Sequence, residues 1–110
     1  MTTMPYVIRF VADMASATRF FQDDLGLTLR FQSPDWTEFD TGSTTLALHA
    51  ATAEGRPGAC QLGLKVDDLD AFHARMTSKG FVFTRAPTLE HGRKIARFRD
   101  RDGAEISVSE

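Results

Sequence analysis

Apolar and polar positions follow the same order twice along this chain. Residues 11–27 and 66–81 each open on a valine that closes an apolar run, pass through one or two aspartates, and continue as an amphipathic stretch that reaches a glycine. A tail of alternating apolar and polar residues follows each copy, at 39–49 and 98–109. This repeat predicts two half-length modules. The surface between such modules is the natural place for a ligand pocket.

The first module begins with a β-branched and aromatic run after Pro5, which predicts a strand. Asp13 or Ser16 caps the helix that follows, and Gly26 ends it. The apolar stripe of this helix consists of Met14, Ala17, Phe20, Phe21 and Leu25. The expected strands of this module are 6–11, 28–32, 36–40 and 45–49.

The second module repeats the order. Asp67 or Asp68 caps its helix and Gly80 ends it, and the Asp102-Gly103 pair predicts the last hairpin turn. The helix stripe consists of Leu69, Phe72, His73 and Met76. The expected strands are 61–66, 81–84, 94–99 and 104–109.

These patterns predict an α+β fold. Each module is βαβββ, with one helix on the outer face of a curved mixed sheet, and the two modules form a cup in a pseudo-twofold arrangement. The whole chain, 1–110, is one domain: a first module at 1–50, a Gly- and Pro-containing linker at 51–59, and a second module at 60–110.

Composition narrows the class of protein. The chain has 110 residues, 42% of them hydrophobic, and a net charge of −2, which favours neither nucleic acid nor an anionic membrane as a partner. The single cysteine, Cys60, cannot form an intrachain disulfide, so we expect a cytoplasmic protein. Neither a signal peptide nor an apolar run long enough to span a bilayer is expected. Arginines gather in the last quarter, either as a solvated, salt-bridged face or as an anion-binding wall.

The ordered set of motifs resembles the vicinal oxygen chelate superfamily, which includes glyoxalase I, extradiol dioxygenases and the bleomycin-resistance proteins. The motifs are the Val-x-Asp strand exits, the Phe20-Phe21-x-x-x-Leu25-Gly26-Leu27 segment and the Asp100-x-Asp102-Gly103 turn. The resemblance covers essentially the whole chain. It implies paired βαβββ modules, a pocket in the concave face and a homodimer.

The resemblance also implies where a divalent metal would be held, by the first and last strands of each module. The matching positions are Tyr6, Ala47, Gln61 and Ser107, with Val7 in place of Tyr6 if the first strand is bulged. These residues include no imidazole and no carboxylate, the side chains that divalent ions prefer. We therefore expect no metal and no other cofactor. His49, two positions past Ala47, is the alternative as a displaced ligand.

Strand alternation assigns a mixed apolar and polar lining to the cup, as in many small-molecule sites. Trp36 either stacks on a ligand or is a core or dimer-interface aromatic residue. Arg97 either clamps a ligand carboxylate or phosphate or pairs with Glu38. His49 is the one candidate for a catalytic base. The expected ligand-binding residues are Tyr6, Phe10, Trp36, Glu38, His49, Gln61, Arg97 and Ser107.

The favoured function is metal-independent binding of a small organic molecule, as in the bleomycin-resistance proteins, for sequestration or antibiotic self-protection. Activity as an enzyme is left open and is the less favoured outcome. The alternative is a metal-dependent lyase, isomerase or dioxygenase with displaced ligands, recruiting His49 and Glu38 or Glu105. A third possibility is an inert structural or regulatory partner. Phosphate-binding loops, a Gly-x-Ser-x-Gly elbow and a basic aromatic surface for nucleic acid are absent.

Overall fold

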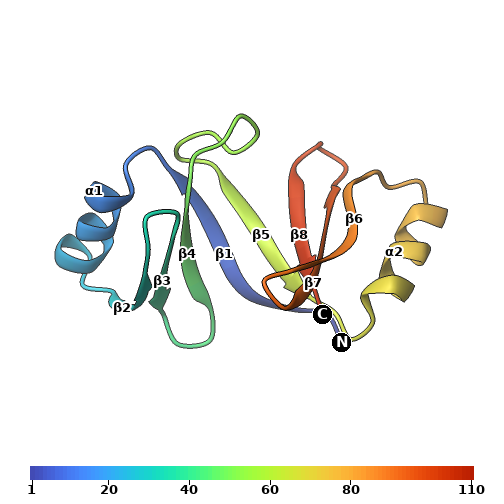
Figure 1. Cartoon of the computed structure of the whole chain (residues 1–110), viewed down its shortest axis with the longest axis horizontal. Helices are drawn as coiled ribbons and strands as arrows, with labels where there is room; N and C mark the ends of the chain where they lie inside the picture. Colours follow the sequence, from blue (N-terminus) through green and yellow to red (C-terminus); the bar gives the residue numbers. More distant parts are fainter. The chain divides into compact units, whose positions relative to one another are not determined.

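The computed structural model describes all 110 residues, which divide into two compact units. The N-terminal unit comprises Pro5–Gln61, and the C-terminal unit comprises Leu62–Glu110 together with Met1–Met4. In each unit a helix packs on one face of a mixed sheet, as Figure 1 shows. The predicted α+β class and the strand–helix–strand–strand–strand order are confirmed in both units.

The N-terminal unit has the strand order β2-β3-β4-β1, with β1 parallel to β4 and the other pairs antiparallel. Its helix is followed directly by a π-helical segment, η1. The elements are β1 Thr3–Val11, α1 Met14–Arg19, η1 Phe20–Asp24, β2 Thr28–Gln32, β3 Trp36–Asp40 and β4 Thr45–Ala50.

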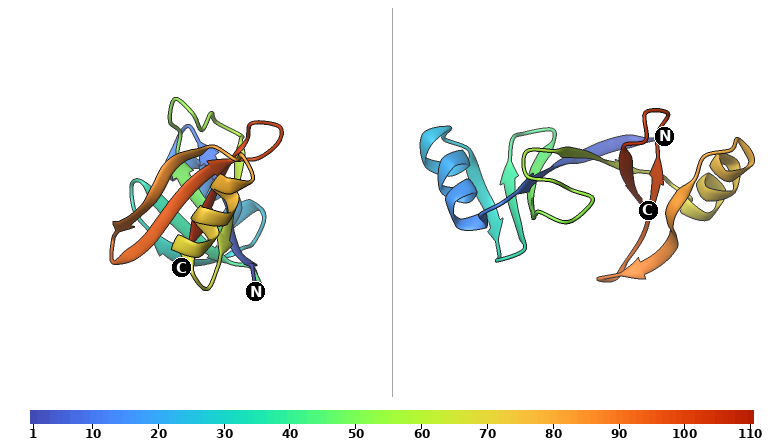
Figure 2. Two further views of the ribbon diagram at one scale, coloured as in Figure 1. Left: turned by 90° about the vertical axis from the view of Figure 1, so that its right-hand side faces the viewer. Right: turned by 90° about the horizontal axis from the view of Figure 1, so that it is seen from above.

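The C-terminal unit has the strand order β5-β8-β7-β6, with β5 parallel to β8 and the other pairs antiparallel. In the two views of Figure 2, α2 lies beside β6 and β7, the strands that it contacts. The elements are β5 Cys60–Lys65, α2 Leu69–Ser78, β6 Phe83–Glu90, β7 Arg93–Arg99 and β8 Glu105–Ser109. None of the helices is long and apolar enough to cross a membrane.

The helix caps settle two alternatives. The Asp13 carboxylate accepts a hydrogen bond from the Ser16 amide at 3.0 Å, and the Asp68 carboxylate accepts one from the Ala71 amide at 3.0 Å. Both aspartates satisfy an amide that the first helical turn leaves without a partner. Asp13 and Asp68 are therefore the N-caps, rather than Ser16 and Asp67.

The predicted stripe of the first helix is only partly correct. Phe21 packs in the core, but Phe20 and Leu25 are 47% and 55% exposed. For Leu25 the cause is a change of helix type, because its amide bonds to the Phe20 carbonyl five residues earlier. The wider π turn rotates later side chains away from the stripe that α-helical spacing predicts.

The cores lie between each helix and its sheet. In the C-terminal unit, Leu69 and Phe72 of α2 pack on Phe98 and Val108. In the N-terminal unit, Phe39 and Leu48 are fully buried beneath the side chains of α1 and η1. Burial of these apolar side chains, at about 25 cal/mol per Å² of apolar surface, is the main stabilising contribution.

Strand β6 differs from the expected 81–84 because it runs on to Glu90 and includes Pro87. Proline is tolerated because β6 stands at the end of the strand order, where an amide need not pair. His91 and Gly92 link β6 to β7, with φ of 51° and 75°. Positive φ at both positions is the geometry of a tight type I′ hairpin.

Candidate functional site

The helix-free side of the N-terminal sheet carries a cluster of aromatic side chains. Alternation along β1, β3 and β4 puts Phe39 and Leu48 beneath α1 and turns their neighbours to the opposite side. Ile8, Phe10 and Ala47 are buried there, and the larger rings are half-buried. We call this surface the aromatic face. It consists of Tyr6, Ile8, Phe10, Trp36, Ala47 and His49.

The rings of the aromatic face meet edge to face. The centroids of Trp36 and His49 are 5.9 Å apart at 89°, and those of Tyr6 and Trp36 are 6.3 Å apart at 83°. The Phe10 and His49 centroids are 5.3 Å apart. These are favourable aromatic geometries. The contacts fix the rings relative to one another and leave their half-buried surfaces available to a flat apolar molecule.

Glu38 lies at the edge of this face with both carboxylate oxygens occupied. Its Oε2 accepts a hydrogen bond from the Trp36 indole nitrogen at 2.8 Å. Its Oε1 accepts two from Arg30, at 3.2 and 3.3 Å, and Arg30 also donates to the Thr45 hydroxyl at 2.5 Å. Glu38 therefore orients the Trp36 ring, and its ion-pair partner in this unit is Arg30.

His49 is also engaged through one ring nitrogen. Its Nδ1 lies 2.6 Å from the Ala50 carbonyl oxygen. Because a carbonyl only accepts, this contact assigns the proton to Nδ1 and leaves Nε2 as an acceptor. No carboxylate of the unit hydrogen-bonds to the ring, so His49 lacks the partner that orients a catalytic base in a triad.

The segment 51–59, expected to be a linker, is packed against the aromatic face. The Phe10 amide donates to the Ala59 carbonyl at 2.9 Å, and the Gly58 amide donates to the Phe10 carbonyl at 2.8 Å. Gly55 is buried on the Phe10 ring, where an added Cβ would lie 2.4 Å from the nearest ring carbon. Arg9 donates to the Gly58 carbonyl at 2.7 Å, which explains a charged residue on the helix side of β1. Apart from the glycine itself, no sequence signal indicates this packing.

The remaining expected site residues are distributed over both units. Gln61 belongs to the N-terminal unit and is 8% exposed, whereas Arg97 and Ser107 belong to the C-terminal unit. Arg97 and Ser107 are register partners on β7 and β8, and Arg97 lies 3.9 Å from Glu90. The structure thus brings together Tyr6, Phe10, Trp36, Glu38 and His49 in one unit, and Arg97 and Ser107 in the other.

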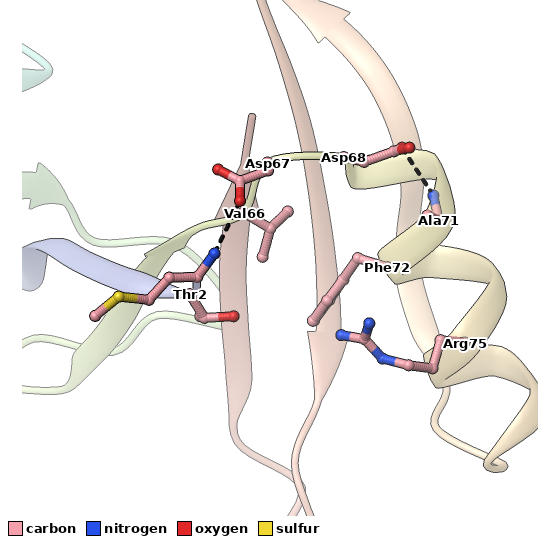
Figure 3. A pocket seen from close by; sticks show the side chains of 8 residues that line it. Thr2, Val66, Asp67, Asp68, Ala71, Phe72 and Arg75 are labelled. Carbon is pink, nitrogen blue, oxygen red and sulfur yellow. Dashed lines mark hydrogen bonds and ion pairs between the residues drawn. The ribbon is translucent and has the colours of Figure 1, made fainter.

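A surface pocket of about 340 Å³ lies at the start of α2 and involves none of the predicted residues. In Figure 3, Phe72 and Arg75 line one side, and Asp67 is joined to the N-terminal ammonium. That ion pair, at 2.8 Å, lowers the pKa of Asp67 through a hydrogen bond and charge attraction. Met1 and Asp67, which form the pair, are almost fully exposed, at 89% and 88%, so the hollow is open to solvent.

The residues at the expected metal positions do not fit a divalent ion. Tyr6, Ala47, Gln61 and Ser107 provide no imidazole and no carboxylate. Neither unit brings together three His, Cys, Asp or Glu side chains that could hold an ion. His49 offers only Nε2, and the oxygens of Glu38 are bound to Arg30 and Trp36. The displaced-ligand alternative therefore has no donor set in the N-terminal unit.

Solved structures show where this fold occurs. No curated protein sequence matches the chain. NAD-dependent benzaldehyde dehydrogenase from Legionella pneumophila aligns with a TM-score of 0.77 at 19% identity, over 94% of this chain and 96% of that one. Methylmalonyl-CoA epimerase from Mycobacterium tuberculosis aligns with a TM-score of 0.74 at 23% identity, over 96% and 85%.

A glyoxalase/bleomycin resistance protein/dioxygenase superfamily member from Vibrio splendidus 12B01 aligns at 0.74 and 13% identity, over 99% and 98%. At these identities the likeness concerns the fold alone. The sequence itself carries the family assignment, because residues 3–108 match the profile of one family. The chain belongs to the Glyoxalase/Bleomycin resistance protein/Dioxygenase superfamily.

Proposed function

We propose that this protein binds a small organic molecule with a flat apolar part, and that the aromatic face holds that part without a divalent metal. The observation that carries the proposal is the packing of Tyr6, Trp36 and His49. Their rings are fixed by edge-to-face contacts and by the bond from Trp36 to Glu38, yet they are only half-buried. Rings held in this way give contact area at a small cost in side-chain entropy.

The proposal favours binding over catalysis. His49 is without a carboxylate partner, and the expected metal positions hold no strong ligand. A base alone, with nothing to stabilise a developing negative charge, gives little rate enhancement. Sequestration of a ligand, self-protection against an antibiotic included, requires neither group. We further propose a cytoplasmic homodimer with no nucleic-acid partner, in keeping with one exposed cysteine and a net charge of −2.

The test is thermal unfolding of the protein in a panel of metabolites and antibiotics that contain planar rings. A ligand that binds only the native state at 100 times its Kd adds about 2.7 kcal/mol of stability. For a domain of this size that stabilisation corresponds to a rise in Tm on the order of 10 °C. Trp36, the only tryptophan, gives a fluorescence signal as a second readout.

Two variants locate the binding. Trp36→Ala should abolish the rise in Tm, whereas Phe31→Ala, which removes a 52% exposed aromatic ring from β2, should leave it unchanged. If no compound of the panel raises Tm, or if Trp36→Ala responds like the wild type, the aromatic face is not the binding surface.

A further inference from the structure

The helix-free side of the C-terminal sheet carries an unusual pair of arginines. Ala96 and Phe98 pack in the core with α2, so alternation along β7 turns Arg97 to the opposite side. Arg97 is the register partner of Arg85 on β6 and of Ser107 on β8. Two guanidinium groups and a hydroxyl therefore stand in one row across three strands. We call this row the arginine row: Arg85, Arg97 and Ser107.

One carboxylate serves both arginines. Glu90 Oε2 lies 3.2 Å from Arg85 Nε and 3.9 Å from Arg97 Nη2. The three side chains are 39%, 33% and 24% exposed for Arg85, Arg97 and Glu90. Two positive charges facing one negative charge leave an excess of one positive charge. Because like charges directly opposite each other in a sheet are destabilising, the pairing of Arg85 with Arg97 is not explained by stability.

The hydrogen-bonding capacity of the row is largely unused. Arg85 Nε and Glu90 Oε2 are buried, and their close approach is an ion pair without a hydrogen bond. A guanidinium carries five N–H donors, which makes Arg85 and Arg97 rich in donors on this side of the sheet. Ser107, which is 5% exposed, adds a hydroxyl donor beside them. Buried donors without acceptors cost free energy, and a bound acceptor removes that cost.

Other charged groups on this side do not cancel the excess. Arg99 donates to the Gly103 carbonyl at 3.0 Å, and Glu105 accepts from the Thr84 hydroxyl at 2.6 Å. Arg99 and Glu105 are register partners, so they balance each other one pair further along the strands. Arg93, the register partner of Glu90, adds a further positive charge.

We propose that the arginine row is itself a binding site for an oxyanion, a carboxylate or phosphate group, within the C-terminal unit. Planar guanidinium groups bind such groups through paired hydrogen bonds, and Ser107 supplies a third donor beside Arg97. Glu90 is the internal counter-ion, which holds the two arginines in place and competes with the incoming anion.

The test is a titration with inorganic phosphate and, separately, with acetate, at constant ionic strength set with chloride. Binding is followed by the NMR signals of the arginine Nε–H groups. Saturable shifts at Arg85 and Arg97 are expected, and the stronger of the two probes identifies the phosphate or the carboxylate class. Arg97→Gln and Arg85→Gln should each weaken binding by about tenfold or more, the loss expected for a charge-assisted hydrogen bond.

Glu90→Gln separates this role from a structural one. Removing the competing carboxylate should tighten phosphate binding several-fold, whereas a salt bridge needed only for folding would show lower stability and no gain in affinity. Lys79→Gln is the control: it removes an exposed positive charge at the end of α2 and should leave the titration unchanged. If Arg97→Gln fails to fold, Arg97→Lys replaces it. Lysine keeps the charge but cannot form paired hydrogen bonds, so this variant too should bind phosphate more weakly.

Shifts no larger than those caused by chloride, or equal titrations in the wild type and in Arg97→Lys, Arg85→Gln and Glu90→Gln, would overturn the inference. The two proposals fail separately. Phosphate binding without any planar ligand in the thermal panel would leave the arginine row standing and refute the aromatic face. The reverse result would retain the aromatic face and refute the arginine row as an anion site.

Discussion

Gly55→Ala tests the packing of segment 51–59 on the aromatic face. An alanine Cβ at this position would lie 2.4, 2.5 and 2.7 Å from three carbons of the Phe10 ring. Carbon atoms in contact normally lie about 3.5–4.0 Å apart, so the loop or the ring must move by about 1 Å. Overpacking of this kind costs about 1–3 kcal/mol. We expect Gly55→Ala to lower the free energy of unfolding by that amount.

The assay is urea unfolding of a double-mutant cycle with Phe10→Leu. Leucine lacks Cε1, the ring carbon at 2.4 Å from the new methyl group, and its Cδ atoms can turn away from it, so part of the cost of Gly55→Ala should disappear in the Phe10→Leu background. Gly58→Ala is the matched control. Its cost comes from a φ of +88°, and its Cβ has only an Arg9 nitrogen at 3.8 Å. Gly58→Ala and Phe10→Leu should therefore have additive effects.

The reasoning is refuted if Gly55→Ala is as destabilising in the Phe10→Leu background as in the wild-type protein. It is also refuted if Gly55→Ala costs less than about 0.5 kcal/mol, the range of an ordinary surface substitution. Either result would mean that the loop does not rest on the ring. The slope of the unfolding curve serves as a check, because a changed slope would indicate a changed unfolded state.

Three further predictions test other parts of the fold. Phe98→Ala should lower the free energy of unfolding in urea by about 3–5 kcal/mol, because the ring is 5% exposed in the C-terminal core. Val82→Ala, at a residue that is 64% exposed, should lower it by less than about 0.5 kcal/mol. Equal losses for the two variants would contradict the core assignment. His91→Asn should stabilise the β6–β7 hairpin slightly, because asparagine adopts a φ of 51° more readily than histidine does. A lower Tm of this variant in thermal unfolding would contradict the type I′ turn. A hydrogen bond to Asp70 raises the pKa of Lys94 above its ordinary value of 10.5. The stabilisation that the charged Lys94 gives the folded protein is therefore complete below that pH and is lost as the pH rises through the folded-state pKa. Lys94→Gln should therefore reduce the loss of stability at alkaline pH, and an unchanged pH profile would refute the pairing.

Much of the fold could be predicted from local patterns. The Val-x-Asp exits, the capping aspartates and strand alternation are nearest-neighbour effects, so they place the elements and separate the helix side of each sheet from the helix-free side. Phe39, Leu48, Phe98 and Val108 pack on the helix side of their sheets for this reason.

The differences arise where geometry depends on longer-range context. The π turn after Arg19 changes the phase of the stripe, and no propensity distinguishes it from an α turn. Pro87 disfavours a strand in a local pattern, although an edge position tolerates it. The partners of Glu38 and Arg97 follow from register and bulges on β2 and β6, which a sequence pattern does not fix. Segment 51–59 resembles a linker because its order comes from the Phe10 ring, not from its own residues.

The central claim is that this superfamily member binds its ligand without a divalent ion. Elemental analysis by mass spectrometry of protein purified without chelator tests that claim most directly. The account predicts zinc, nickel, iron and manganese well below one ion per chain, unchanged in His49→Ala. A stoichiometric ion in the wild-type protein that is lost in His49→Ala would contradict it.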